Sequence, residues 1–164
     1  MSTRCQTKVF QTGTGWDQAV TLYHHCDGYP SAMLPLFAEA WLKFGTGSVT
    51  GNAFPYKRGW ECGRAGHVAS YLCATDPDGF EPEEGHGLHG DIEWYYTLEC
   101  RNASGGSMAE SPEWFVQVHD IENVFTDDAK PVPIGEPISC VALAEMSADQ
   151  MNALCETFNT SEVG

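Results

Sequence analysis

Positively charged residues are scarce in this sequence. Its 164 residues include 8 Lys and Arg against 23 Asp and Glu, so the formal charge is −15 at neutral pH. Proteins that bind nucleic acid need clustered cations to contact phosphates, and this composition therefore predicts no direct DNA or RNA partner. The same negative field favours a basic protein surface, bound cations, or a role as a decoy for nucleic acid.

Signals for export, membrane insertion and common cofactors are also missing. The N-terminal residues lack the apolar core of a signal peptide, and no apolar run reaches the roughly 18 residues of a membrane span. We therefore expect a cytoplasmic protein without a membrane partner. No C-x-x-C pair, G-x-G-x-x-G fingerprint, P-loop or G-x-S-x-G elbow occurs, so no cofactor is predicted, and a divalent metal is kept only as an alternative.

The seven cysteines form an odd set without a recognisable pairing pattern. In a cytosolic protein they are expected to stay reduced. Most have apolar neighbours, as Cys73 has in Tyr71-Leu72-Cys73-Ala74. We therefore expect them to serve mainly as small buried hydrophobic residues.

Core-forming residues, in contrast, are plentiful. Hydrophobic residues make up 42% of the chain and aromatic residues 12%, which is far from the composition of a disordered acidic tail. The length suits one domain over residues 1–164, with residues 159–164 as a frayed tail.

The hydrophobic periodicity predicts an α+β fold. Strands are expected at residues 4–10, 19–25, 92–100, 114–118 and 138–144. Helices are expected at residues 31–44, 64–74 and 148–158. This order predicts an antiparallel sheet of about four or five strands, covered on one face by about three helices.

The densest polar cluster is the octapeptide Tyr23-His24-His25-Cys26-Asp27-Gly28-Tyr29-Pro30, which follows the second predicted strand. His25 and Asp27 fall on the same side of an extended chain, and they are candidates for proton transfer or metal ligation. The alternative is a turn at Asp27-Gly28, whose carboxylate accepts backbone N–H groups at the start of the following helix.

A second cluster lies in residues 76–91, which hold six carboxylates and two histidines. His86, His89 and Asp91 would complete a metal site with His25 and Asp27 if this segment folds back onto the first hairpin. The favoured interpretation is a solvated acidic loop, because carboxylates in exposed turns keep their hydration and lose little free energy.

Three of the eight cations, Lys57, Arg58 and Arg64, fall in one short region beside Tyr56 and Trp60. Arginine next to aromatic rings suits a small anionic ligand, which makes Arg58 a binding candidate. Simple compensation of the surrounding negative charge is the favoured interpretation.

Two motifs carry a resemblance to a known group of proteins. Thr3-Arg4-Cys5-Gln6 and the octapeptide match the T-R-x-Q start and the Y-x-H-x-D-G-Y-P motif of small, uncharacterised phage, prophage and bacterial proteins, and His89 to Tyr96 is similar as well. The resemblance implies an origin in a mobile element, without a defined activity. The matching positions are Arg4, Gln6, His25, Asp27, Gly28, Tyr29 and Pro30.

Three functions are consistent with these features. The favoured hypothesis is an acidic, non-enzymatic module that binds a basic protein, such as a phage-encoded inhibitor of a nucleic-acid-binding host defence complex. Its candidate binding residues are Arg4, Tyr23, Tyr29, Arg58, Glu81, Glu83 and Glu84. The alternatives are a small metal-dependent hydrolase or nucleotide-processing enzyme using His25 and Asp27 with His86 or His89, and a virion-associated structural protein.

Overall fold

The chain folds around a six-stranded sheet. The computed structural model describes residues 3–11, 18–44, 64–85, 87–101, 113–119, 121–122, 132–133, 139–143, 149–150, 152–153 and 156. The sheet has the strand order β3-β2-β1-β4-β5-β8. Its strands are β1 (Cys5–Gln11), β2 (Gln18–His24), β3 (Phe80–Pro82), β4 (Trp94–Arg101), β5 (Glu113–His119) and β8 (Ser139–Ala142).

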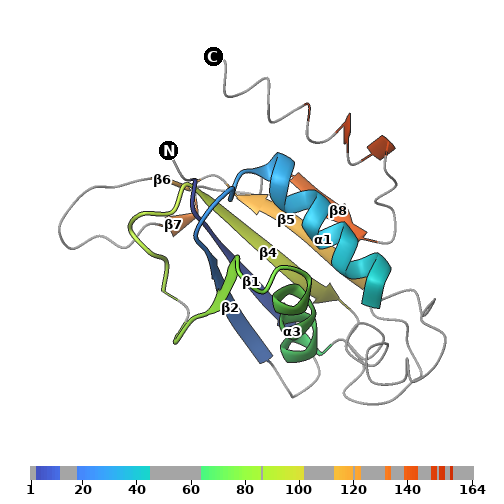
Figure 1. Ribbon diagram of the computed structural model, residues 1–164, viewed down its shortest axis with the longest axis horizontal. Helices are drawn as coiled ribbons and strands as arrows, with labels where there is room; N and C mark the ends of the chain where they lie inside the picture. The colour runs from blue at the N-terminus through green and yellow to red at the C-terminus, as the bar shows by residue number, and fades with distance from the viewer. Residues whose placement is uncertain are drawn as a thin grey trace.

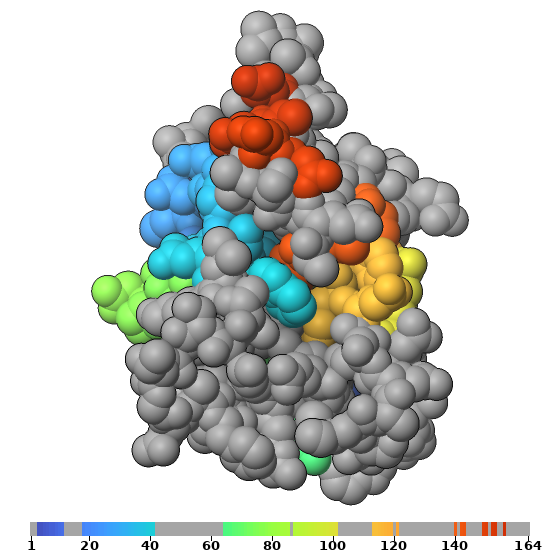
Figure 2. Space-filling view, turned by 90° about the vertical axis from the view of Figure 1, so that its right-hand side faces the viewer, coloured from blue at the N-terminus to red at the C-terminus, as the bar shows by residue number. Residues whose placement is uncertain are grey.

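Two helices, α1 (Pro30–Phe44) and α3 (Ala65–Thr75), lie together on one face of this sheet (Figure 1). α3 contacts β1 and β2, and α1 passes over the half of the sheet that contains β5. Figure 2 shows α1 in blue to cyan beside the orange residues of β5. A small second ladder pairs β6 (Ile121–Glu122) with β7 (Val132–Pro133).

The predicted α+β class is confirmed, but a purely antiparallel sheet is wrong. β1 pairs with β2, and β4 with β5, in the expected antiparallel hairpins. β1 and β4, however, are parallel, with Cys5 opposite Trp94. Parallel neighbours need a long crossover, and the chain between β1 and β4 includes both helices, which supply it.

β3 is the strand of the six-stranded sheet that the sequence did not predict, and the short β6 and β7 were not predicted either. β3 lies inside the segment expected to be a solvated acidic loop, and it pairs with the end of β2 at the edge of the sheet. Three residues that include Glu81 and Pro82 carry no strand signal of their own. Its pairing depends on the preceding turn, which places it beside His24.

Both described helices bury the faces that their periodicity predicted. Leu34, Phe37 and Ala38 are buried in α1, and Ala65, Val68, Ala69 and Leu72 are buried in α3. α1 begins at Pro30, where the fixed φ of proline suits the first helical position and its missing N–H is not needed.

The described residues contain two helices rather than the expected three. Of the third, predicted at 148–158, only residues 149–150, 152–153 and 156 are described, and their backbone is helical. Neither α1 nor α3 has the length and apolarity needed to cross a bilayer.

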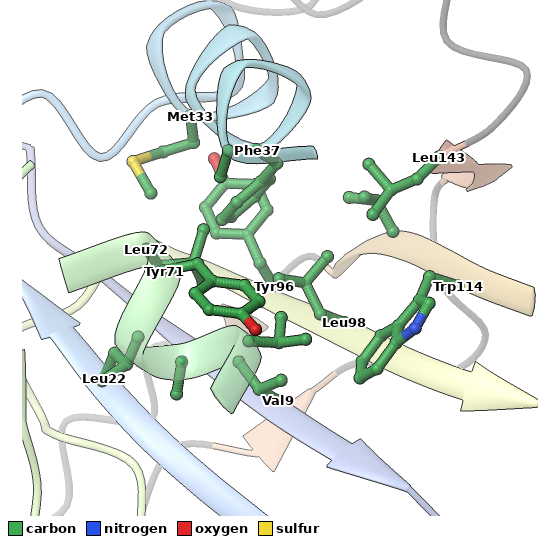
Figure 3. Packing of buried hydrophobic residues seen from close by; sticks show 14 of the residues in the cluster. Val9, Leu22, Met33, Phe37, Tyr71, Leu72, Tyr96, Leu98, Trp114 and Leu143 are labelled. Carbon is green, nitrogen blue, oxygen red and sulfur yellow. The ribbon is translucent and has the colours of Figure 1, made fainter. Parts of the chain in front are cut away.

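The main core fills the space between the helices and the sheet (Figure 3). Val9 and Leu22 extend from the sheet towards Met33, Phe37 and Leu72 of the helices, and all five side chains are fully buried. The Phe37 ring meets the Tyr96 ring edge to face, with their centroids 5.6 Å apart. Aromatic pairs of this geometry add about 1 kcal/mol to the energy of burial alone.

A smaller cluster covers the opposite face of the sheet near the start of β1. Its buried members are Tyr23, Ile92, Tyr95 and Ile121, with Leu88 packed against them. β4 was predicted to be buried on one face, but this cluster also buries Tyr95. Ile92 precedes the strand and joins this cluster rather than the main core.

The expectation that the cysteines are mainly buried is correct for only some of those that the structure describes. All five described cysteines are free. Cys5 and Cys100 are buried, and burial raises the pKa of both thiols, that of Cys100 to about 12. Cys26 and Cys140 are exposed, because one lies after the end of β2 and the other on the edge strand β8.

Candidate functional site

Six carboxylates lie in residues 78–93, which include β3 and the segment that leads to β4. Figure 1 draws this part of the chain in green to yellow-green. Five of them are exposed and Glu83 is half-buried. We call this set the acidic edge, and its members are Asp78, Glu81, Glu83, Glu84, Asp91 and Glu93. The predicted acidic segment therefore runs from the edge strand β3 to the start of β4.

Backbone hydrogen bonds attach both ends of this segment to the sheet. Glu81 lies opposite Tyr23 in the β2–β3 pair, and the N–H of Glu83 donates to the carbonyl of Thr21 at 2.9 Å. At the other end, the N–H of Glu93 donates to the carbonyl of Arg4, also at 2.9 Å. The segment therefore begins beside β2, where β3 pairs with it, and ends beside the residue that precedes β1.

Gln6 holds the middle of the segment. Its side chain is fully buried, and its Nε2 donates to the carbonyl of Gly87 at 3.2 Å. Its Oε1 accepts the backbone N–H of His89 at 2.9 Å. A buried amide that satisfies two main-chain groups is favourable, because these groups would otherwise lose their bonds to water.

Tyr23 lies at the centre of the side chains that face the acidic edge. Its hydroxyl donates to Asp91 Oδ2 at 3.1 Å, and the Arg4 guanidinium binds the same oxygen at 2.8 Å. Its ring contacts His25 on one side and His89 on another, with centroid separations of 4.6 and 4.9 Å. Burial and the Asp91 carboxylate raise the pKa of Tyr23 to about 12, so its phenol stays a proton donor at neutral pH.

Each of these two histidines also meets a carboxylate of the acidic edge. His25 Nε2 lies 2.8 Å from Glu81 Oε2, and His89 Nε2 lies 2.5 Å from Glu83 Oε2. The other ring nitrogen of His89, Nδ1, is 4.0 Å from Asp91 Oδ1. The site thus alternates acidic and titratable basic groups around Tyr23.

The predicted catalytic and metal-binding residues are only partly brought together. His89 and Asp91 are neighbours, whereas His25 binds a different carboxylate, and both histidines contact the ring of Tyr23. Among the described residues, no set of three or more His, Cys, Asp or Glu side chains could hold a metal ion. His86 lies outside the described residues.

Asp27 is exposed and has a left-handed backbone with φ of 53°. This supports the turn interpretation of Asp27-Gly28. Its carboxylate, however, forms no hydrogen bond with the residues that the structure describes. The N–H groups of Ala32 and Met33, in the first turn of α1, instead donate to the carbonyl of Tyr29.

Gly28 brings the two motifs of the resemblance together. Its N–H donates to the carbonyl of Thr3 at 2.9 Å, and its carbonyl accepts the hydroxyl of Tyr96 at 2.8 Å. A Cβ at position 28 would lie 2.8 Å from both the Cβ and the backbone nitrogen of Cys5. Only glycine allows this close approach, which sets the start of α1 against the start of β1.

A pair that sequence reasoning missed lies on the helical face of the sheet. His24 is buried, and its Nε2 lies 2.9 Å from Asp76 Oδ2, while Asp76 Oδ1 accepts the N–H of Gly79 at 3.1 Å. Alternation along β2 placed His24 on the face of Leu22, which was the available signal for its burial. The pair joins the end of α3 to the end of β2 and so positions β3.

Of the remaining binding candidates, Tyr29 is half-exposed and Arg58 lies outside the described residues. Comparisons with protein-family models, curated proteins and solved structures give no match for this chain. The function of the site is therefore inferred from its geometry alone.

Proposed function

We propose that this protein is a non-enzymatic module that binds a basic partner protein along the acidic edge. The observation that carries the proposal is the arrangement of six carboxylates on one edge, where Arg4 is the one permanently charged cation that pairs with them among the described residues. A concentrated negative potential accelerates encounter with a cationic surface and selects against acidic partners.

The acidic edge is also anchored to the sheet at several points. The side chains of Gln6 and Tyr23 and the backbone bonds of Glu83 and Glu93 all tie it there. A pre-organised surface loses less conformational entropy when it binds than a flexible acidic tail does. This supports a specific docking surface over charge that serves solubility alone.

We propose further that the partner belongs to a nucleic-acid-binding host complex in the cytoplasm, which the protein inhibits. A surface that normally contacts phosphates presents clustered Lys and Arg, and the acidic edge has the complementary charge. A metal-dependent hydrolase has less support, because His25 and His89 each bind a separate carboxylate.

Charge reversal tests the proposal. Asp78, Glu84 and Glu93 are exposed, and their side chains bind no other group in the described part of the chain, so Asp78→Lys, Glu84→Lys and Glu93→Lys should leave the fold intact. Titration calorimetry with a decapeptide of alternating Lys and Arg measures affinity at low and high salt. We expect the triple variant to bind about tenfold or more weakly, since three exposed charges contribute about 0.5 kcal/mol each.

The matched control places the same charge change elsewhere. Glu39, Asp149 and Glu156 are exposed outside the acidic edge, and their reversal to Lys alters the net charge equally. This control should retain affinity within about twofold of the wild-type protein. Equal losses in both variants, or wild-type binding that does not weaken with added salt, would contradict a docking surface at the acidic edge.

A further inference from the structure

His25 and His89 occupy the same carboxylates that a basic partner would use. His25 is 53% exposed and its partner Glu81 is 64% exposed. His89 is 45% exposed and bonds to the less accessible Glu83. Both rings are therefore open to solvent and to protons, while each already lies at hydrogen-bonding distance from a member of the acidic edge.

We propose that acidification releases the basic partner, because protonated His25 and His89 form internal ion pairs with Glu81 and Glu83. This inference rests on the proposed function of the acidic edge. A neutral imidazole offers one weak donor to a carboxylate, which leaves the carboxylate charge available to a partner lysine or arginine. An imidazolium offers a full positive charge at the same position and competes with the partner directly.

The change in local charge is large for this edge. Six carboxylates and Arg4 give the acidic edge a net charge of −5, and protonation of both histidines makes this charge less negative, at −3. Long-range attraction for a cationic surface falls in proportion, in addition to the direct competition.

The carboxylates beside each histidine favour this response. His25, directly after β2, faces Glu81 of β3 and the ring of Tyr23. His89 faces Glu83, Asp91 and Tyr23, and its backbone is held by Gln6 of β1. Arg4 binds Asp91 beside this group, and its charge does not change with pH in this range.

The other described histidines are poorly placed for such a role. His24 is buried against Asp76 on the helical face, and His119 of β5 contacts Tyr95 and Thr97. His67 is exposed on α3 and binds no carboxylate among the described residues. His67 therefore provides a control for the general effect of removing an exposed histidine.

Binding of the Lys/Arg decapeptide, with its N-terminus acetylated and its C-terminus amidated, is measured at pH 7.5 and pH 5.5 to test this inference, because its remaining charged groups do not titrate in this range. We expect wild-type affinity to fall about fivefold or more at the lower pH, and the His25→Gln/His89→Gln variant to change less than about twofold. The His67→Gln control should show the wild-type response. Circular dichroism at both pH values verifies folding, and the two single variants serve if the double variant is unstable.

The outcomes separate the two proposals. Absence of salt-sensitive peptide binding at pH 7.5 would overturn the proposed function and this inference with it. Binding at pH 7.5 that is equally strong at pH 5.5, or a double variant with the wild-type pH response, would overturn the release mechanism and leave the docking surface standing.

Discussion

The backbone N–H of His89 donates a hydrogen bond to the buried side chain of Gln6 at 2.9 Å, across 83 positions of sequence. The same side chain donates to the carbonyl of Gly87 at 3.2 Å. Through these two bonds, the first strand of the protein determines where the acidic segment lies. The orientation of His89 towards Glu83 depends on this attachment.

Replacing Gln6 with Leu should therefore destabilise the protein by about 2 kcal/mol, because it removes two partly buried hydrogen bonds between this side chain and the main chain. Urea denaturation followed by tryptophan fluorescence measures this change. Gln18→Leu is the matched control, since Gln18 is exposed and bonds to the N–H of Gly66 at 3.1 Å. We expect the control to lose less than about 1 kcal/mol. Equal losses would show that Gln6 is not an anchor.

Gly28→Ala should reduce stability by about 2–3 kcal/mol, because the added Cβ would overlap the main chain of Arg4 and Cys5, which cannot move aside without disrupting β1. Gly90→Ala is the control, because a Cβ there would meet no atom within 4 Å. Thermal unfolding of the two variants gives the comparison. A Gly28→Ala protein as stable as Gly90→Ala would contradict the close approach.

Tyr23→Phe removes the hydroxyl bonded to Asp91 and keeps the ring between His25 and His89. The expected cost is about 1 kcal/mol, since the acceptor is a carboxylate that is partly open to water. Tyr29→Phe is the matched control, because the Tyr29 hydroxyl has no partner among the described residues. A Tyr23→Phe protein with the stability of this control would indicate that water replaces the hydroxyl without cost.

His119 predicts a pH dependence of stability. Burial lowers its pKa below the ordinary value of 6.5, so below that pH the unfolded chain takes up a proton that the folded chain does not. The stability that depends on neutral His119 is therefore present above about pH 6.5 and is lost as the pH falls through the lowered pKa.

The substitution His119→Gln should make the fall in stability between pH 7.5 and pH 5 shallower than in the wild-type protein. Denaturation midpoints at several pH values in this window measure the slope. His67→Gln, on the exposed face of α3, should leave it unchanged. An unchanged slope in His119→Gln would mean that the folded protein protonates His119 as readily as the unfolded chain does.

Local pattern was sufficient for much of this structure. Strand alternation placed Leu22 and His24 on one face, and helical spacing identified the buried sides of α1 and α3. These signals are read within a few residues, because side-chain direction follows directly from backbone period. The separation of His25 from His24, the last residue of β2, follows from the same rule.

The site required information that no local pattern contains. The sequence showed that residues 76–91 were acidic, but not that β3 would pair with β2, or that Gln6 would hold Gly87 and His89. The candidate metal ligands His25 and His89 are instead paired with Glu81 and Glu83, which were candidate binding residues, and no local pattern announced these pairs.

The sequence by itself determined the negative charge, the α+β class, the two hairpins and the buried faces of the helices, because composition and periodicity are properties of neighbouring residues. Only the tertiary structure decided that β4 lies parallel to β1 and that Tyr23, His25, His89, Arg4 and Asp91 share one surface. The physical reason is that the packing of α1 and α3 over the sheet brings distant segments side by side, and contacts between distant segments leave no mark on either segment alone.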